Sequence, residues 1–273
     1  MTLATTSTTR NGMAYRRAGN GPPVLLLHGI PGSSASWLAV GERLASVADV
    51  IVPDLLGFGA SVRPSGLDAL HARAQAEAVA DLLDDLAVGP VTVIGHDFGG
   101  PVALMLHRTD SRRVRALGLL ATNTFTDTPI PFPLSTVTWP GIGSLAARAL
   151  FSAPSLRMMM RQGVGAGGER PDARSAVGDR AQQRTIATIF AGSLRNLAAL
   201  YAPVEAELRT VSVPGFVAWG DCDPFFPLAQ GERTATAARV PLHVYEGAGH
   251  FLPDERPDAV ARDVAALVAR VTA

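Results

Sequence analysis

The chain contains little cysteine, no excess charge and no long apolar run. Cys222 is the single cysteine among 273 residues, which excludes an internal disulfide and a thiolate metal cluster. Lys+Arg and Asp+Glu number 24 each, so no net charge favours nucleic acid or an anionic membrane. No apolar run reaches the roughly 18 residues of a membrane span, and the polar first ten residues do not resemble a leader. These features predict a soluble, cytoplasmic protein that binds a small molecule, with no nucleic-acid or membrane partner.

Apolar segments alternate with amphipathic segments along most of the chain. Helical periodicity is clearest at 70–87 and at 256–271, near the end of the chain. Six continuous apolar runs are predicted to be strands covered on both faces: 23–29, 49–54, 91–96, 114–121, 213–220 and 241–247. Alternating strands and helices predict an α/β fold with a mostly parallel, doubly wound sheet.

The alternation is interrupted between residues 122 and 210. A segment rich in Thr, Pro and Phe is followed there by helix-like pieces, without a clear strand. We predict a helical cap, residues 122–210, inserted between two parts of a core domain, residues 1–121 and 211–273. Such an insertion would lie over the carboxyl ends of the strands, where sheets of this kind bind ligands.

Residues 95–99 read Gly-His-Asp-Phe-Gly and follow a predicted strand. Glycines on either side of a strained central residue are typical of a nucleophile elbow, because a β-carbon at those positions would collide with the adjoining strand and helix. Asp97 would then stand at the N-terminus of the next helix, where the helix dipole favours an ionised carboxylate. An aspartate that only caps this helix is the alternative.

Three further loops carry groups that such a nucleophile needs. The His-Gly-Ile-Pro loop can direct the backbone N–H of Ile30 to the same point as the N–H of Phe98, which provides two donors for an oxyanion. Asp223 precedes a Pro-Phe-Phe-Pro turn, and we prefer it to Asp221 as the acid that orients a histidine. His250 lies in a glycine-rich loop and completes the order nucleophile, acid, histidine at the ends of successive strands.

The motifs HGIPGSSASW, VPDLLGFGAS, GHDFGG, WGDCDP and GAGHFLPDERP, in this order, resemble those of the α/β-hydrolase superfamily over nearly the whole chain. The aspartate at the elbow is similar to the epoxide hydrolase and haloalkane dehalogenase branch. A carboxylate suits displacement at an sp³ carbon, whereas its attack on an acyl group would give a costly anhydride. The resemblance implies that Asp97 forms an alkyl-enzyme ester, which His250, oriented by Asp223, hydrolyses without a metal or organic cofactor.

The leaving group separates the two reactions of this branch. Dehalogenases assist halide departure with a tryptophan directly after the nucleophile and an Asn or Trp elsewhere. Phe98 and Ile30 occupy the two motif positions and have no side-chain donor, which leaves Trp139 in the insertion as a candidate. Epoxide hydrolases usually supply two tyrosines, or a His and a Tyr, from the cap, and here the cap contains only Tyr201 and no histidine. We expect epoxide hydrolase-like opening of an apolar electrophile, with dehalogenation as an alternative.

Two other readings remain open. Asp97, alone or with His250, could act as a general base in a non-hydrolytic cyclisation, addition or isomerisation of secondary metabolism. A ligand-binding or receptor module without catalysis is the last alternative. His96, next to the elbow, joins Tyr201 and Trp139 as a candidate for binding substrate, and nothing in the sequence indicates the oligomeric state.

Overall fold

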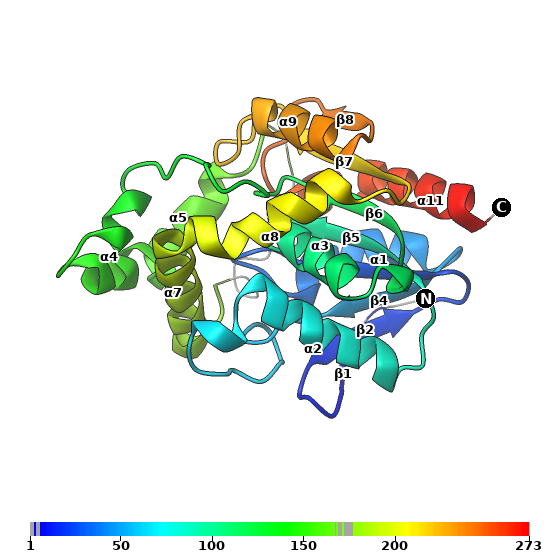
Figure 1. Cartoon of the computed structure of the whole chain (residues 1–273), viewed down its shortest axis with the longest axis horizontal. Helices are drawn as coiled ribbons and strands as arrows, with labels where there is room; N and C mark the ends of the chain where they lie inside the picture. The colour runs from blue at the N-terminus through cyan, green and yellow to red at the C-terminus, as the bar shows by residue number, and fades with distance from the viewer. Residues whose placement is uncertain (1–2, 4–5, 167, 169–170, 172–176, 273) are drawn as a thin grey trace.

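The computed structural model describes residues 3, 6–166, 168, 171 and 177–272. Its strands form one sheet in the order β1-β2-β4-β3-β5-β6-β7-β8 (Figure 1). β2 is antiparallel to β1 and β4, and the other pairs are parallel. The strands are β1 (Thr6–Thr8), β2 (Ala14–Ala18), β3 (Pro23–Leu27), β4 (Asp49–Pro53), β5 (Val91–His96), β6 (Val114–Leu120), β7 (Gly215–Gly220) and β8 (Leu242–Tyr245). The predicted α/β fold with a mostly parallel sheet is confirmed.

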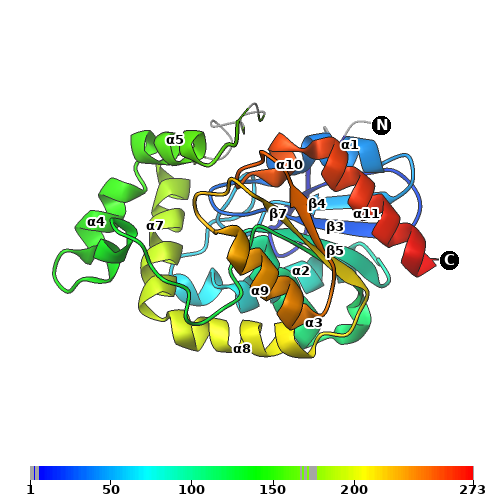
Figure 2. The same cartoon turned by 90° about the horizontal axis from the view of Figure 1, so that it is seen from above.

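Helices cover both faces of the sheet because successive side chains of a strand point to opposite faces. Leu25 and Leu27 of β3 pack in the cluster that includes α2 (Ala72–Asp85), α3 (Gly99–Thr109) and α9 (Leu228–Ala238). Val24 and Leu26 pack on the opposite face with α1 (Leu38–Leu44) and α11 (Pro257–Thr272). Figure 2 shows these two helices side by side. This double coverage explains why the inner strands are continuous apolar runs.

The chain between β6 and β7 is helical. It forms the 3₁₀ helix η4 (Leu134–Thr138), then α4 (Gly143–Leu150), α5 (Ala153–Gln162), α7 (Arg180–Arg195) and α8 (Leu197–Thr210). Figures 1 and 2 show α4, α5 and α7 set to one side of the sheet, whereas α8 returns along α3. Val204 and Leu208 of α8 join the core there. The cap boundaries at 122 and 210 stay a prediction, and part of 163–177 lies outside the described residues.

The predicted strands agree with the observed ones to within three residues at each end. The two predicted helices correspond to α2 and α11. β1 and β2 are absent from the sequence-based expectations, because β2 reads Ala-Tyr-Arg-Arg-Ala and is only partly buried, so that it lacks a continuous apolar run. Among the described residues, no helix combines the length and hydrophobicity that crossing a bilayer requires.

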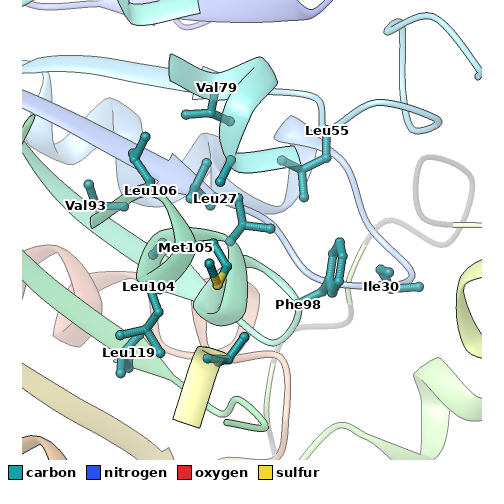
Figure 3. Packing of buried hydrophobic residues seen from close by; sticks show 14 of the residues in the cluster. Leu27, Ile30, Leu55, Val79, Val93, Phe98, Leu104, Met105, Leu106 and Leu119 are labelled. Carbon is teal, nitrogen blue, oxygen red and sulfur yellow. The ribbon is translucent and has the colours of Figure 1, made fainter. Parts of the chain in front are cut away.

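The largest apolar cluster extends from the sheet toward the loops at the carboxyl ends of the strands. Figure 3 shows Leu27, Val93 and Leu119 from the sheet packed with Leu106 of α3. The remaining helices are short: the 3₁₀ helices η1 (Ser34–Trp37), η2 (Leu67–Ala69) and η3 (Ser111–Arg113), and the α-helix α10 (Leu252–Glu255). The packed sheet therefore provides a rigid support for the loops that follow β3, β5, β7 and β8.

Candidate active site

Asp97 occupies the sharp turn between β5 and α3. Its φ is +50°, a left-handed backbone conformation that residues other than glycine rarely adopt. A β-carbon on Gly95 would overlap the backbone of Gly99, and one on Gly99 would overlap the carbonyl group of Leu27. The two glycines therefore let strand and helix approach closely enough to present the Asp97 side chain at the apex, as the elbow motif predicts.

The Asp97 carboxylate is held by a backbone donor from the loop after β3. The N–H of Ile30 donates a hydrogen bond of 2.6 Å to Asp97 Oδ1. Within the described residues, the N–H of Phe98 makes no hydrogen bond to this carboxylate. Phe98 is the N-cap of α3, where N–H groups have no intrahelical acceptor. Figure 3 shows the Phe98 and Ile30 side chains together at one margin of the apolar cluster. The two loops thus meet at Asp97.

His250 lies between two carboxylates that come from different loops. Its Nδ1–H donates to Asp223 Oδ2 at 2.8 Å, and its Nε2 lies 3.7 Å from Asp97 Oδ2. Asp223 Oδ1 accepts from the N–H groups of Phe225 and Phe226 at 2.8 and 3.0 Å, which fixes this carboxylate. Asp221 instead accepts from the N–H of Gly247 and does not contact the histidine. The structure therefore brings Asp223 to His250, and it leaves Asp221 in a turn.

Aromatic rings surround the His250 imidazole. Phe225, Phe226 and Phe251 meet it edge-on, with ring centroids 5.1, 5.5 and 5.2 Å away. His96 packs on another side at 5.1 Å, and its Nε2–H donates to the His250 carbonyl oxygen at 2.8 Å. Only 3% of the His250 surface is exposed. This enclosure limits access of water to the imidazole except from the cavity side.

The two carboxylates control the charge of His250. Burial alone would lower its pKa, but the negative charge of Asp223 and its hydrogen bond, reinforced by Asp97, raise the pKa to about 10. The Asp97 pKa is lowered: burial opposes ionisation, but the adjacent His250 and the Ile30 N–H outweigh it. At neutral pH the site therefore holds an imidazolium between two carboxylates.

A cavity of about 220 Å³ opens above Asp97 and His250. Ile30, Phe98 and Phe251 contribute its wall from the core side. The helical segment contributes the other wall, with Thr128, Pro129, Ile130, Pro131, Leu134, Met159, Ile189, Phe190, Ser193, Leu194, Leu197 and Tyr201. Because apolar side chains dominate this wall, the cavity suits a mainly apolar small molecule.

Tyr201 is the candidate acid of the helical segment, and it lines the cavity from α8. Its hydroxyl has no hydrogen-bond partner among the described residues. Burial, and then the charge of Asp97, raise its pKa above the ordinary tyrosine value, so the phenol stays protonated. Ser193, near the end of α7, lines the same cavity, and its hydroxyl is also without a partner in the described part of the chain. Sequence reasoning missed Ser193, because a helical serine carries no motif.

The other two candidates for substrate binding lie away from the cavity wall. Trp139 follows η4 and is 50% exposed, and it is not among the residues that line the cavity. His96 is buried behind His250 and does not line the cavity either. Burial, followed by the charge of His250, lowers the His96 pKa to about 4, so its ring is neutral at pH 7. The structure thus places His96 as a support for the His250 backbone, and gives Trp139 no contact with the site.

Within the residues that the structure describes, no group of three His, Cys, Asp or Glu side chains is arranged to hold a metal ion. The polar side chains that line the cavity are the Asp97 carboxylate, the His250 imidazole, the Tyr201 phenol, the Ser193 and Thr128 hydroxyls and the Asn123 amide. This set can attack an electrophilic carbon, transfer protons and stabilise an oxyanion.

Known proteins with related sequences include hydrolases of two kinds. A soluble epoxide hydrolase of a Corynebacterium species is 46% identical over 92 residues, which cover 33% of this chain and 31% of that protein. Haloalkane dehalogenase 2 of Mycobacterium tuberculosis is 28% identical over 281 aligned residues, covering 96% and 92% of the two chains. The crystal structure of haloalkane dehalogenase DbeA from Bradyrhizobium elkani superposes with a TM-score of 0.82 at 21% identity, over 97% of both chains, and shows likeness of fold.

A family model described as alpha/beta hydrolase fold matches residues 22–257. This range contains all the strands from β3 onward, the helical segment and every loop that reaches the cavity. The chain is a member of the α/β-hydrolase family, related to epoxide hydrolases and haloalkane dehalogenases.

Proposed function

We propose that the protein is a hydrolase that opens an apolar epoxide through an ester of Asp97. The observation that carries this proposal is the placement of an unpartnered, protonated Tyr201 phenol in the same cavity as the Asp97 carboxylate. An epoxide needs these two groups at once, a nucleophile at carbon and an acid for the departing oxygen. The apolar cavity wall supports a substrate with few polar groups.

In the first step, Asp97 Oδ2 attacks an epoxide carbon. The C–O bond of the ring breaks, and the alkoxide takes the proton of the Tyr201 hydroxyl. Asp97 suits this step because its side chain lines the cavity and the Ile30 N–H holds Oδ1, which leaves Oδ2 as the attacking oxygen. The products are a hydroxyalkyl ester on Asp97 and a tyrosinate.

Ester formation changes the charge around His250. It removes the negative charge of Asp97, which helps to raise the His250 pKa in the free protein. The imidazolium then loses its proton to the tyrosinate, directly or through water, and becomes a base. His250 takes a proton from a water molecule, which attacks the ester carbonyl, and the Ile30 N–H stabilises the oxyanion. Release of the diol restores the carboxylate and the imidazolium, so protons balance over the cycle.

The site supports halide release less well. Ile30 and Phe98 present no side-chain donor to the cavity, and Trp139 does not line it. The cavity offers a departing halide the hydroxyl groups of Tyr201 and Ser193, whereas the Thr128 hydroxyl already donates to Asn123 Oδ1 and the Asn123 amide to the Phe125 carbonyl oxygen. Dehalogenation is therefore the weaker proposal, despite the relatives that carry this name.

One observation favours a second candidate, a non-hydrolytic proton transfer. The imidazolium of His250 and the carboxylate of Asp97 lie 3.7 Å apart in the free protein. An acid and a base so close together could shuttle a proton across a substrate in a cyclisation, addition or isomerisation. Such a reaction would form no ester on Asp97.

The test is the intact mass of the His250→Ala protein after incubation with epoxides, alkyl halides and inert controls. Removal of the base should leave any ester trapped on the protein. We expect an adduct of the full epoxide mass, located on Asp97 by peptide mapping, and none in the Asp97→Asn/His250→Ala double variant. An adduct that lacks halide would instead support dehalogenation. Turnover by the wild type without any adduct on the single variant would contradict the ester and support proton transfer. Binding without turnover would support a receptor module.

A further inference from the structure

Glu255 is a buried carboxylate that the proposed reaction does not use. It ends α10, five residues after His250, and only 5% of its surface is exposed. It does not line the cavity. Within the described residues, no Lys, Arg or His side chain forms an ion pair with it. A carboxylate in such a place requires other partners, because burial of an unpaired charge is costly.

Three backbone N–H groups supply those partners. Glu255 Oε2 accepts from Gly249 at 2.9 Å, and Oε1 accepts from Phe251 at 3.0 Å. These are the two residues that flank His250 in the chain. The third donor is the N–H of Gly165, at 2.7 Å from Oε2, which belongs to the segment after α5. The same carboxylate therefore holds the backbone on both sides of His250 and joins it to the helical segment.

The segment at Gly165 lies directly on the His250 loop. The N–H of His250 donates to the Gly163 carbonyl oxygen at 2.7 Å. A β-carbon on Gly165 would overlap the Gly247 carbonyl oxygen, and one on Gly249 would overlap the Gly163 carbonyl oxygen. Such close contact of the two backbones is possible only because these positions are glycines. Residues 163–165 and 247–251 thus form one hydrogen-bonded unit with Glu255 at its centre.

We propose that Glu255 is a positioning residue for His250, and that it sets the imidazole against Asp97 for the hydrolysis of the ester. This inference rests on the proposed function. The side-chain torsions of His250 start from a Cα whose neighbours on both sides are fixed by one carboxylate. Small rotations of that backbone would move the distant Nε2 atom by larger amounts. Loss of Glu255 should therefore disturb the step that His250 performs.

The two chemical steps should respond differently. Formation of the ester depends on Asp97 and Tyr201, whereas its hydrolysis depends on His250. A displacement of about 1 Å in a reacting group can lower a rate by about 100-fold. We expect Glu255→Gln to slow ester hydrolysis by about 10-fold to 100-fold and to leave ester formation at the wild-type rate. General destabilisation would lower both steps in proportion, because it reduces only the fraction of active protein.

The matched control is Glu246→Gln, which removes the same charge from an exposed side chain four residues before His250. Both variants would be followed by time-resolved intact mass with the epoxide that labels His250→Ala. The expected result is accumulation of the ester in E255Q and no accumulation in E246Q. Equal slowing of both steps in E255Q, or no slowing of hydrolysis, would overturn the proposal. If E255Q does not fold, Glu255→Asp replaces it, because aspartate keeps the charge but is one methylene shorter.

A second measurement separates this proposal from the proposed function. The His250 Nδ1–H proton, hydrogen-bonded to Asp223, should give a low-field NMR signal in the substrate-free protein. We expect this signal to shift or broaden in E255Q and to remain unchanged in E246Q. An unchanged signal in folded E255Q would contradict the positioning role. If His250→Ala forms no ester with any electrophile while this signal responds, the proposed function fails and the positioning role stands.

Discussion

Asp97 Oδ2 and His250 Nε2 lie 3.7 Å apart, close enough for attraction between charges but beyond the range of a hydrogen bond. The attacking oxygen is therefore not engaged by the imidazole, and no hydrogen bond has to break before it meets a substrate. Its partner oxygen is held at 2.6 Å by the Ile30 N–H. This asymmetry between the two oxygens of one carboxylate favours Oδ2 as the nucleophile in the proposed reaction.

The first prediction concerns the charge of Asp97. Asp97→Asn should lower turnover by roughly 10⁴-fold or more, as expected for loss of a nucleophile. It should also lower the His250 pKa from about 10, because only Asp223 would remain to stabilise the imidazolium. NMR titration of His250 measures the second effect without substrate. Asp81→Asn, an exposed carboxylate of α2, is the control and should change neither quantity. An unchanged His250 pKa in Asp97→Asn would contradict the coupling of the two residues.

The second prediction concerns stability and pH. The His250 pKa is 6.5 in its ordinary state and about 10 in the folded protein. A raised folded pKa stabilises the protonated form, so this contribution is complete below pH 6.5 and is lost as pH rises toward 10. His250→Asn cannot titrate. The melting temperature of the wild type minus that of His250→Asn should therefore decrease as the pH rises from 6.5 to about 10. A difference that stays constant or moves in the opposite direction would rule out the raised pKa.

The third prediction concerns Tyr201. Replacement by phenylalanine removes the proton donor but keeps the ring that lines the cavity. Ester formation from an epoxide should slow by about 10²-fold, the lower range of general acid catalysis. Single-turnover intact mass in the His250→Ala background measures this step alone. Tyr15→Phe, on β2 and away from the cavity, is the matched control. An equal rate in Tyr201→Phe and the control would mean that another group protonates the alkoxide.

The fourth prediction concerns Ser193. Its hydroxyl lines the cavity with Tyr201, and we expect it to donate a second hydrogen bond to the departing oxygen. Ser193→Ala should slow ester formation by about tenfold, the equivalent of one hydrogen bond. Ser144→Ala, on the exposed side of α4, serves as the control. The Tyr201→Phe/Ser193→Ala double variant tests whether both hydroxyls act on one oxygen. If they act independently, the two reductions in the rate of ester formation should multiply.

Much of the fold could be predicted because its determinants are local. Continuous apolar runs identify strands buried on both faces, and six of the eight strands have this pattern. β1 and β2 lack it because they lie toward one edge of the sheet, where only the first residue of β2, Ala14, is fully buried. A strand of this composition is recognised only by its partner, and β2 pairs with β4, more than thirty residues later in the chain.

The order of the candidate residues was also predictable, but their contacts were not. Asp97, Asp223 and His250 each follow a strand, and parallel strands bring such loops to one edge. Trp139 and His96 show the limit of this reasoning. Whether a residue of the helical segment faces the cavity depends on how η4 packs, and the structure leaves Trp139 half exposed. His96 is adjacent to Asp97 in the chain, but the structure buries its ring against His250 and Phe251, outside the lining of the cavity.

The sequence by itself determined the elbow, because the steric reasons for Gly95, Asp97 and Gly99 lie within five neighbouring residues. It also determined the chemical types of the groups available. Only the tertiary structure decided that Asp223 rather than Asp221 meets His250, that Ser193 faces the cavity, and that Glu255 joins the His250 loop to Gly165. These relationships depend on distances between segments far apart in the chain, which are set by the order of the strands and by the packing of helices against them.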